Sequence, residues 1–172
     1  SDVVRKTLLT YWNTVSFFTL YAKASNFDLT SPMGLPSIMD RWIDSELNQL
    51  ILSVDLAYAN FDSQEAGRVL AAFIDDLSNW YVRRSRRKFW DGDVAALNTL
   101  YTCLKELTLL MAPMVPFITE HFWQSLVRVL EPTEFVSIHL ALFPEVKQGI
   151  LNEKLIAEVS LSRRLVELGR AA

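Results

Sequence analysis

The amino-acid sequence predicts an all-α protein: an antiparallel helical bundle of about five helices, followed by a short extended segment and a further C-terminal helix. Three observations predict this fold. Apolar residues recur every three or four positions over most of the 172 residues, which is the spacing of amphipathic helices. Residues that favour helix starts, and prolines that break helices, separate these periodic stretches. A run with β-branched residues occurs in one place, near residue 138.

The composition excludes several classes of protein. An apolar share of 51% is too high for a disordered chain, and the apolar stretches are too interrupted for a membrane span. The single cysteine, Cys103, excludes an internal disulfide and a multi-cysteine zinc site. The sequence opens into a helical pattern without a signal peptide and does not begin with Met, so we expect a fragment of a cytoplasmic protein.

The first two helices are expected at residues 3–24 and 37–61. Extra apolar residues widen the stripe of the first helix, so we expect it to be covered on more than one side. A loop with two prolines follows. Ser37 then stands where a serine caps a helix N-terminus, so it is the predicted start of the second helix.

The third helix is expected to begin at Asp62, because Glu65 three positions later completes a pattern like that of a capping box. Its apolar stripe continues through Tyr81 into a basic segment. The run Asp91-Gly92-Asp93 is predicted to end this helix and to cap the fourth.

The fourth helix is expected to reach Met111, where prolines break the chain. Pro116 suits the first turn of a fifth helix, which is expected to run to about Leu130.

The character of the sequence changes after Pro132. The run from Phe135 to Leu142 suits an extended segment, and Asn152 is placed to cap a last amphipathic helix that ends at Gly169. We therefore predict two parts, a helical bundle at residues 1–131 and a truncated appendage at residues 132–172.

The basic segment is the main functional signal. Five of the six residues at 83–88 are Arg or Lys, and without them the formal net charge would fall from -3 to -8. Tryptophan and other aromatic residues flank the segment on both sides. Cations bind phosphates, and aromatic rings stack on unpaired bases, which favours a single-stranded or looped nucleic acid. The alternative at this point is a solvated helix end whose cations complement the helix dipole.

The helical period also predicts which way these side chains face. It places Arg84, Ser85 and Lys88 on the buried side of the third helix, with Arg84 paired with a residue of another helix. It places Arg83, Arg86 and Arg87 on a different, outward side.

Residues for catalysis are missing from the pattern. Two histidines, His121 and His139, are too few for a metal site, and the scattered glycines form no phosphate-binding loop. Cys103 lies among leucines and is expected to be a buried structural thiol. No combination of nucleophile, base and oxyanion donor is recognisable, so we predict no catalytic residue, no metal site and no cofactor in this chain.

Several motifs resemble one known family. Asp40-Arg-Trp-Ile43 after a proline-containing loop is similar to the start of the helical anticodon-binding domain in the isoleucyl and valyl group of class I aminoacyl-tRNA synthetases. The stretch Leu9–Ala22 resembles the helix that joins the catalytic core to that domain, as part of residues 1–24. The basic segment, Asp75–Trp90, resembles the form found in isoleucyl-tRNA synthetases, in a eukaryote-like branch shared with some bacteria. Leu110–Glu120 resembles the proline-broken helix pair of the class, and the resemblance covers essentially the whole chain.

The resemblance implies a tRNA-binding module of an ATP-dependent isoleucine–tRNA ligase. The ATP-binding signatures of the family do not occur in these residues, so the chain alone should be inactive. ATP and Mg²⁺ belong to the full-length protein. The expected partners are isoleucine-accepting tRNA and, within the same protein, the catalytic domain; neither a membrane nor DNA is expected.

The residues expected to contact tRNA carry cations, an amide or indole rings. They are Trp42, Asn79, Trp80, Arg83, Arg84, Arg86, Arg87, Lys88 and Trp90. Two other interpretations remain open: the same domain of a valyl or other class I synthetase, and a helical protein-interaction module whose basic strip docks an acidic partner.

Overall fold

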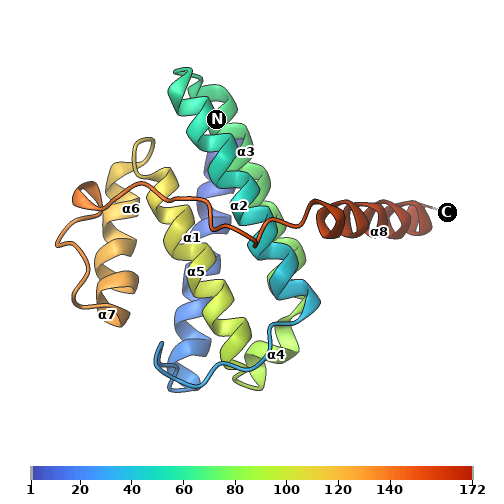
Figure 1. Ribbon diagram of the computed structural model, residues 1–172. Helices are drawn as coiled ribbons and strands as arrows, with labels where there is room; N and C mark the ends of the chain where they lie inside the picture. The colour runs from blue at the N-terminus through green and yellow to red at the C-terminus, as the bar shows by residue number, and fades with distance from the viewer. Residues whose placement is uncertain (1, 172) are drawn as a thin grey trace.

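The computed structural model describes residues 2–171, and all regular structure in them is helical (Figure 1). Four long helices form the bundle: α1 (Asp2–Ala24), α2 (Ile38–Ala59), α3 (Ser63–Asp75) and α5 (Val94–Met111). Helices α2 and α3 form an antiparallel pair, and α1 and α5 pack against them. The predicted all-α fold is confirmed.

Shorter elements continue or connect these helices. They are the π-helical segment η1 (Asp76–Val82), α4 (Arg86–Trp90), α6 (Pro116–Phe122), the π-helical segment η2 (Trp123–Val127), α7 (Arg128–Leu130), the 3₁₀ turn η3 (Ile138–Leu140) and α8 (Glu153–Ala171). Because η1 follows α3 without a break, and η2 joins α6 to α7, the bundle contains two long helices with a local change of pitch.

The predicted helix starts are confirmed by their side-chain hydrogen bonds. Ser37 forms a complete capping box at α2, and Asp62 and Asp93 each accept a backbone N–H at the first turn of α3 and α5. Pro116 occupies the first turn of α6, and Asn152 accepts a backbone N–H in the first turn of α8. Each bond satisfies a donor that the helix itself leaves free.

Helix α5 lies at the centre of the core. Its residues Leu97, Leu100, Leu104 and Leu107 are completely buried, and they face α1, α2 and α6. Full burial of one such side chain contributes about 1.5–3 kcal/mol, so this row is a main source of stability.

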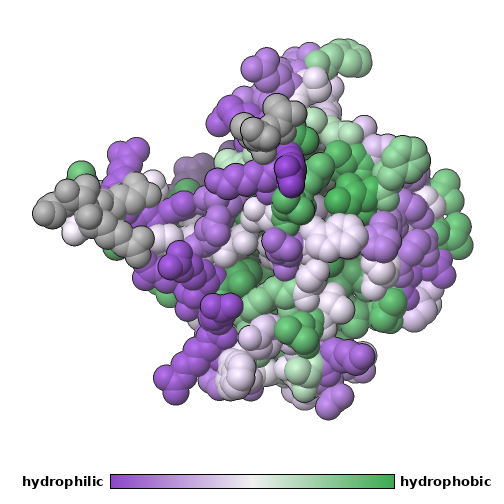
Figure 2. All heavy atoms as spheres, turned by 180° about the vertical axis from the view of Figure 1, so that it is seen from behind, coloured by the Kyte–Doolittle hydropathy of each residue, from purple (hydrophilic) through white to green (hydrophobic). Residues whose placement is uncertain are grey.

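The expectation that α1 is covered on more than one side is met only in part: Phe17 and Tyr21 pack against the core, but the outer face of the helix is open. Its inner residues are buried, but Leu9 and Leu20 are 52% and 66% exposed. The helix lies at the edge of the bundle, where α3, α5 and the Phe122 side chain of α6 cover its inner face. Figure 2 views the face on which α1 lies and shows hydrophobic side chains gathered on its surface.

The segment from Phe135 to Leu142 is not extended throughout, as the sequence had predicted. Ser137 caps the short turn η3, and the Glu120 carboxylate accepts hydrogen bonds from the Ser137 hydroxyl and the Ile138 N–H. A side chain from another helix therefore bends the chain here, which local β propensity does not reveal. Irregular chain at residues 142–147 continues along the bundle.

Helix α8 projects from the bundle as an arm (Figure 1). Two hydrogen bonds fix the chain before it to α2: Lys147 N–H donates to Asn48 Oδ1 at 2.8 Å, and Ser45 Oγ donates to the Ile150 carbonyl at 3.0 Å. The helix continues to Ala171 rather than ending at Gly169. The proposed division between residues 1–131 and 132–172 stays a prediction.

Candidate nucleic-acid interface

The basic segment, residues 83–88, lies where the helix that starts as α3 ends. The π-helical segment η1 carries the chain to Val82, and the helix breaks at Ser85 before α4 begins. Ser85 is only 4% exposed, and its backbone N–H donates to the Tyr81 carbonyl at 2.9 Å. The segment is thus folded as a bent helix end at one end of the bundle.

A buried polar cluster supports this bend from inside. Asp40, at the start of α2, is completely buried. Its Oδ1 accepts the Tyr81 hydroxyl at 2.7 Å, and its Oδ2 accepts the Lys88 ammonium at 3.2 Å and the Ser37 hydroxyl at 2.7 Å. Lys88 also lies 3.4 Å from the carboxylate of Asp93, the cap of α5. One carboxylate therefore links α2, η1, α4 and, through Lys88, α5.

The chemistry of Asp40 matches this supporting role. Burial alone would raise its pKa, but hydrogen bonds from Ser37, Tyr81 and Lys88 outweigh burial and hold the pKa below its ordinary value. Burial beside the same carboxylate raises the pKa of Tyr81 well above its ordinary value, so Tyr81 stays a neutral donor. The buried Asp40 carboxylate is therefore compensated by hydrogen bonds from Ser37, Tyr81 and Lys88 and by the positive charge of Lys88.

The outward side of the bend carries the other cations. Arg83, Arg84, Arg86 and Arg87 are all exposed, and Trp90 is 77% exposed beside them. Arg87 lies 3.8 Å from Asp91, but the Arg87 side chain is 94% exposed. A pair of this kind contributes little and leaves the guanidinium accessible to another anion.

The expectation that Arg84 faces inward is wrong. The π-helical pitch of η1 takes more residues per turn than an α-helix, so Ser85 rather than Arg84 follows Tyr81 on the buried side. The Arg84 guanidinium instead lies 4.2 Å from the centre of the Trp80 ring. The inward, paired cation of the segment is Lys88.

The aromatic and amide residues divide between accessible and occupied positions. Trp42 is completely buried and donates its indole N–H to Glu46 at 3.1 Å, so in this structure it supports α2 instead of facing a ligand. Trp80 is half-buried, with the guanidinium groups of Arg84 and Arg163 over its ring. Trp90 is the indole of the predicted set that is open to stacking.

Asn79 is exposed, but its amide nitrogen donates to Asp75 Oδ1 at 2.7 Å. A base edge would have to replace this hydrogen bond. Asn79 therefore stays a candidate at the edge of the surface.

Sequence reasoning missed two residues at this end of the molecule. Arg41 is exposed in the first turn of α2, directly after the buried Asp40. Its position in the motif Asp40-Arg-Trp-Ile43 was the available signal. Arg163 of α8 lies 2.6 Å from Asp76 and 5.0 Å from the centre of the Trp80 ring. Nothing in the local sequence relates α8 to η1, so this contact required the tertiary structure.

The cysteine and one of the two histidines have structural surroundings. Cys103 is completely buried, and burial raises its pKa well above the ordinary value, so it is not a nucleophile. The His121 ring stacks on Trp12 at 5.4 Å. Among residues 2–171, no three His, Cys, Asp or Glu side chains are grouped to hold a metal ion.

None of the described helices has both the length and the apolar character needed to cross a bilayer.

The fold and the site together define a helical module with a cationic, aromatic-flanked end. The sequence narrows the class further. Residues 40–172 match the family described as the anticodon-binding domain of tRNA ligase, and the chain belongs to this family.

Curated relatives agree with the family match. The chain is 51% identical to an isoleucine–tRNA ligase of Streptomyces avermitilis, over 99% of this chain and 16% of that protein. It is 52% identical to the isoleucine–tRNA ligase of Thermobifida fusca, over 99% of this chain and 17% of that protein. It is 43% identical to the isoleucine–tRNA ligase of Dehalococcoides mccartyi, over 99% of this chain and 18% of that protein. The chain thus spans about a sixth of the length of these relatives.

Proposed function

We propose that this chain is the part of an isoleucine–tRNA ligase that binds the anticodon stem-loop of an isoleucine-accepting tRNA. The observation that carries the proposal is the exposed row of Arg83, Arg86 and Arg87 beside the exposed Trp90. Guanidinium groups can hold the phosphates of the loop, and an open indole can stack on an unpaired base. The family match and the names of the relatives support tRNA over other polyanions.

The contacting set is revised by the geometry. Arg83, Arg84, Arg86 and Arg87 are proposed to contact phosphates directly, together with Arg41 from α2. Trp90 is proposed to stack on a base. Three other residues of the predicted set, Trp42, Trp80 and Lys88, are proposed to hold the shape of the surface from within: Trp42 is buried, and Trp80 and Lys88 are half-buried beside their partners.

The full-length ligase is proposed to be a cytoplasmic enzyme that uses ATP and Mg²⁺ in a catalytic domain outside this chain. The chain would then position the tRNA and would not form aminoacyl-tRNA by itself.

The catalytic domain is proposed to contact the outer face of α1. Leu9 and Trp12 are partly exposed there, and Phe117 of α6 is 91% exposed. An apolar groove of about 580 Å³ lies between α1, α3 and the end of α5. Leu9→Ser should then lower aminoacylation by the full-length ligase while the affinity of the isolated chain for tRNA stays unchanged. Full activity of this variant would contradict the contact.

The central proposal is tested by fluorescence anisotropy with the 172-residue chain. Isoleucine-accepting tRNA, the same tRNA with a changed anticodon, and an acidic peptide are each titrated across a salt series. Tighter binding of the unchanged tRNA, with a steep salt dependence, is expected. Equal affinity for both tRNAs would reduce the function to a phosphate contact without anticodon recognition. Preference for the peptide would favour a protein-interaction module instead.

A further inference from the structure

The surface between α8 and η1 contains a contact that the proposed function does not explain. Arg163 of α8 lies 2.6 Å from Asp76 and over the Trp80 ring at 5.0 Å. Arg84, from the basic segment, lies over the same ring at 4.2 Å. Two cations that would otherwise repel each other thus share one indole, and one of them is neutralised by a carboxylate.

The surroundings of Arg163 are acidic and partly buried. The side chains of Arg163 and Asp76 are 26% and 22% exposed. Burial raises the pKa of Asp76, and the nearby Arg163 opposes this rise. Burial raises the pKa of Glu46 on α2, and the negative charge of nearby Asp76 raises it further. The positive charge of Arg163 lowers the pKa of Glu46. Asp75 adds a further negative charge next to Asp76. Arg163 is therefore the cation that compensates a cluster of carboxylates.

The contacts between α8 and the bundle change along the helix. Leu155 is buried and Val159 packs against the core, but Leu161, Leu165 and Leu168 farther along are 60–69% exposed. Apolar packing thus holds the first two turns of α8. The pair of Arg163 with Asp76 is the ionic contact, among the described residues, that joins the later turns to the bundle.

We propose that Arg163 is a positioning residue for tRNA binding: it docks α8 on η1 and, across the Trp80 ring, holds Arg84 in place beside the exposed arginines of the basic segment. This inference rests on the proposed function, because it assigns a supporting residue to the same tRNA surface. A guanidinium that is already ordered loses less conformational entropy when it binds a phosphate. Docking of α8 and binding of tRNA therefore favour each other by the same factor.

Two arginines of α8 provide a matched test. Arg163→Gln and Arg164→Gln remove the same charge from adjacent positions, and Arg164 is exposed. We expect Arg163→Gln to weaken tRNA binding about 5- to 10-fold, and Arg164→Gln less than 2-fold. Pulsed electron paramagnetic resonance between spin labels at Ala72→Cys on α3 and Ser162→Cys on α8 should show a broadened distance distribution for Arg163→Gln alone. Equal losses of affinity in the two variants would overturn the proposal, because charge alone would then explain them.

A double-mutant cycle separates positioning from general damage. If Arg163 acts through Arg84, Arg163→Gln should cost little additional affinity in an Arg84→Gln background. Fully additive losses would overturn the proposal. Absence of tRNA binding by the unaltered chain at low salt would overturn both the proposed function and the coupling, whereas the spin-label distance would still report whether Arg163 docks α8.

Discussion

Positively charged side chains lie on both sides of the basic segment, but the one inside the bend is paired with carboxylates, whereas those outside are exposed. Inside the bend, Lys88 is paired with the completely buried Asp40 and with Asp93. Outside it, Arg86 and Arg87 project from the same short helix and are exposed. A cation beside a buried carboxylate stabilises the fold, whereas an exposed cation contributes little to stability and stays free for a ligand. The inner side should therefore control folding and the outer side binding.

The largest expected effect tests the inner side. Asp40→Ala removes the acceptor of Tyr81, Ser37 and Lys88 and should lower the free energy of unfolding by about 3 kcal/mol, the scale of a broken buried ion pair. Urea denaturation at pH 7 measures it. The control is Asp91→Ala, which removes only the exposed partner of Arg87 and should change stability by less than about 0.5 kcal/mol. Equal effects of the two substitutions would contradict the comparison.

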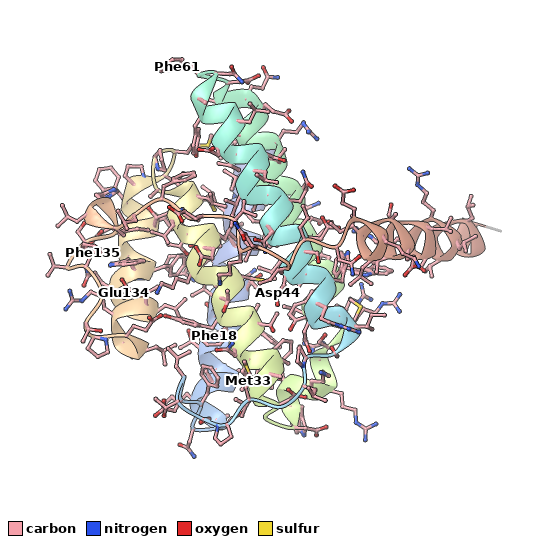
Figure 3. The ribbon with its side chains drawn as sticks, viewed as in Figure 1. Phe18, Met33, Asp44, Phe61, Glu134 and Phe135 are labelled. Atoms are coloured by element: carbon pink, nitrogen blue, oxygen red, sulfur yellow. The ribbon has the colours of Figure 1, made fainter. Side chains whose placement is uncertain are left out.

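A second carboxylate on α2, that of Asp44, sharpens the comparison, because it is half-buried and forms no ion pair with any residue that the structure describes. Asp44 lies where the irregular chain crosses α2 (Figure 3). Burial raises its pKa to about 6; Lys147 opposes this rise and Asp40 adds to it. Since the folded pKa lies above the unfolded value near 3.8, Asp44 favours the folded state at low pH, and this contribution is lost as the pH rises through 6.

Asp44→Asn should therefore stabilise the chain at pH 8 by about 1–3 kcal/mol, at roughly 1.4 kcal/mol per pKa unit, and have little effect at pH 4. Thermal unfolding at both pH values measures the difference. The control is Asp55→Asn, at an exposed position of the same helix, where a surface substitution should change stability by no more than about 0.5 kcal/mol. A loss of stability at pH 8 would mean that the attraction between Asp44 and Lys147 outweighs burial.

Trp90 tests the outer side. Trp90→Ala should weaken tRNA binding by about 1–3 kcal/mol if the indole stacks on a base. The free energy of unfolding should change much less than the affinity, because the Trp90 side chain is 77% exposed. Phe89→Ala is the neighbouring contrast: Phe89 is completely buried, so this change should mainly destabilise the fold. Unchanged affinity in Trp90→Ala would remove base stacking from the proposal.

The smallest effect on stability is expected for the outward arginines. Arg86→Gln or Arg87→Gln should change the free energy of unfolding by no more than about 0.5 kcal/mol. Each should flatten the slope of log K against log salt by about 0.7–0.9, the value for one phosphate contact. Anisotropy titrations at several salt concentrations measure the slope. An unchanged slope would show that the substituted residue does not contact a phosphate.

Much of the fold follows from local rules in the sequence. Ser37, Asp62 and Asp93 begin helices where short-range hydrogen bonding predicts, and the apolar rows identify the inner faces of α2 and α5. The position of the basic segment at a helix end was also predictable, because Asp91-Gly92-Asp93 ends the helix and Gly92 adopts a positive φ of 69°. The family resemblance adds the proposed ligand.

The tertiary structure decided which cation serves which purpose. The sequence by itself determined that five basic residues cluster at 83–88, but it assigned Arg84 to the inside. The periodicity also placed Lys88 on the inner side, where the structure pairs it with the buried Asp40 carboxylate, whereas the π-helical pitch of η1 turns Arg84 outward. Arg163 could not be related to the segment at all, because its partners lie some eighty residues earlier in the chain. Periodicity fixes the faces of a regular helix, whereas a change of pitch and contacts between distant segments depend on how the whole chain packs.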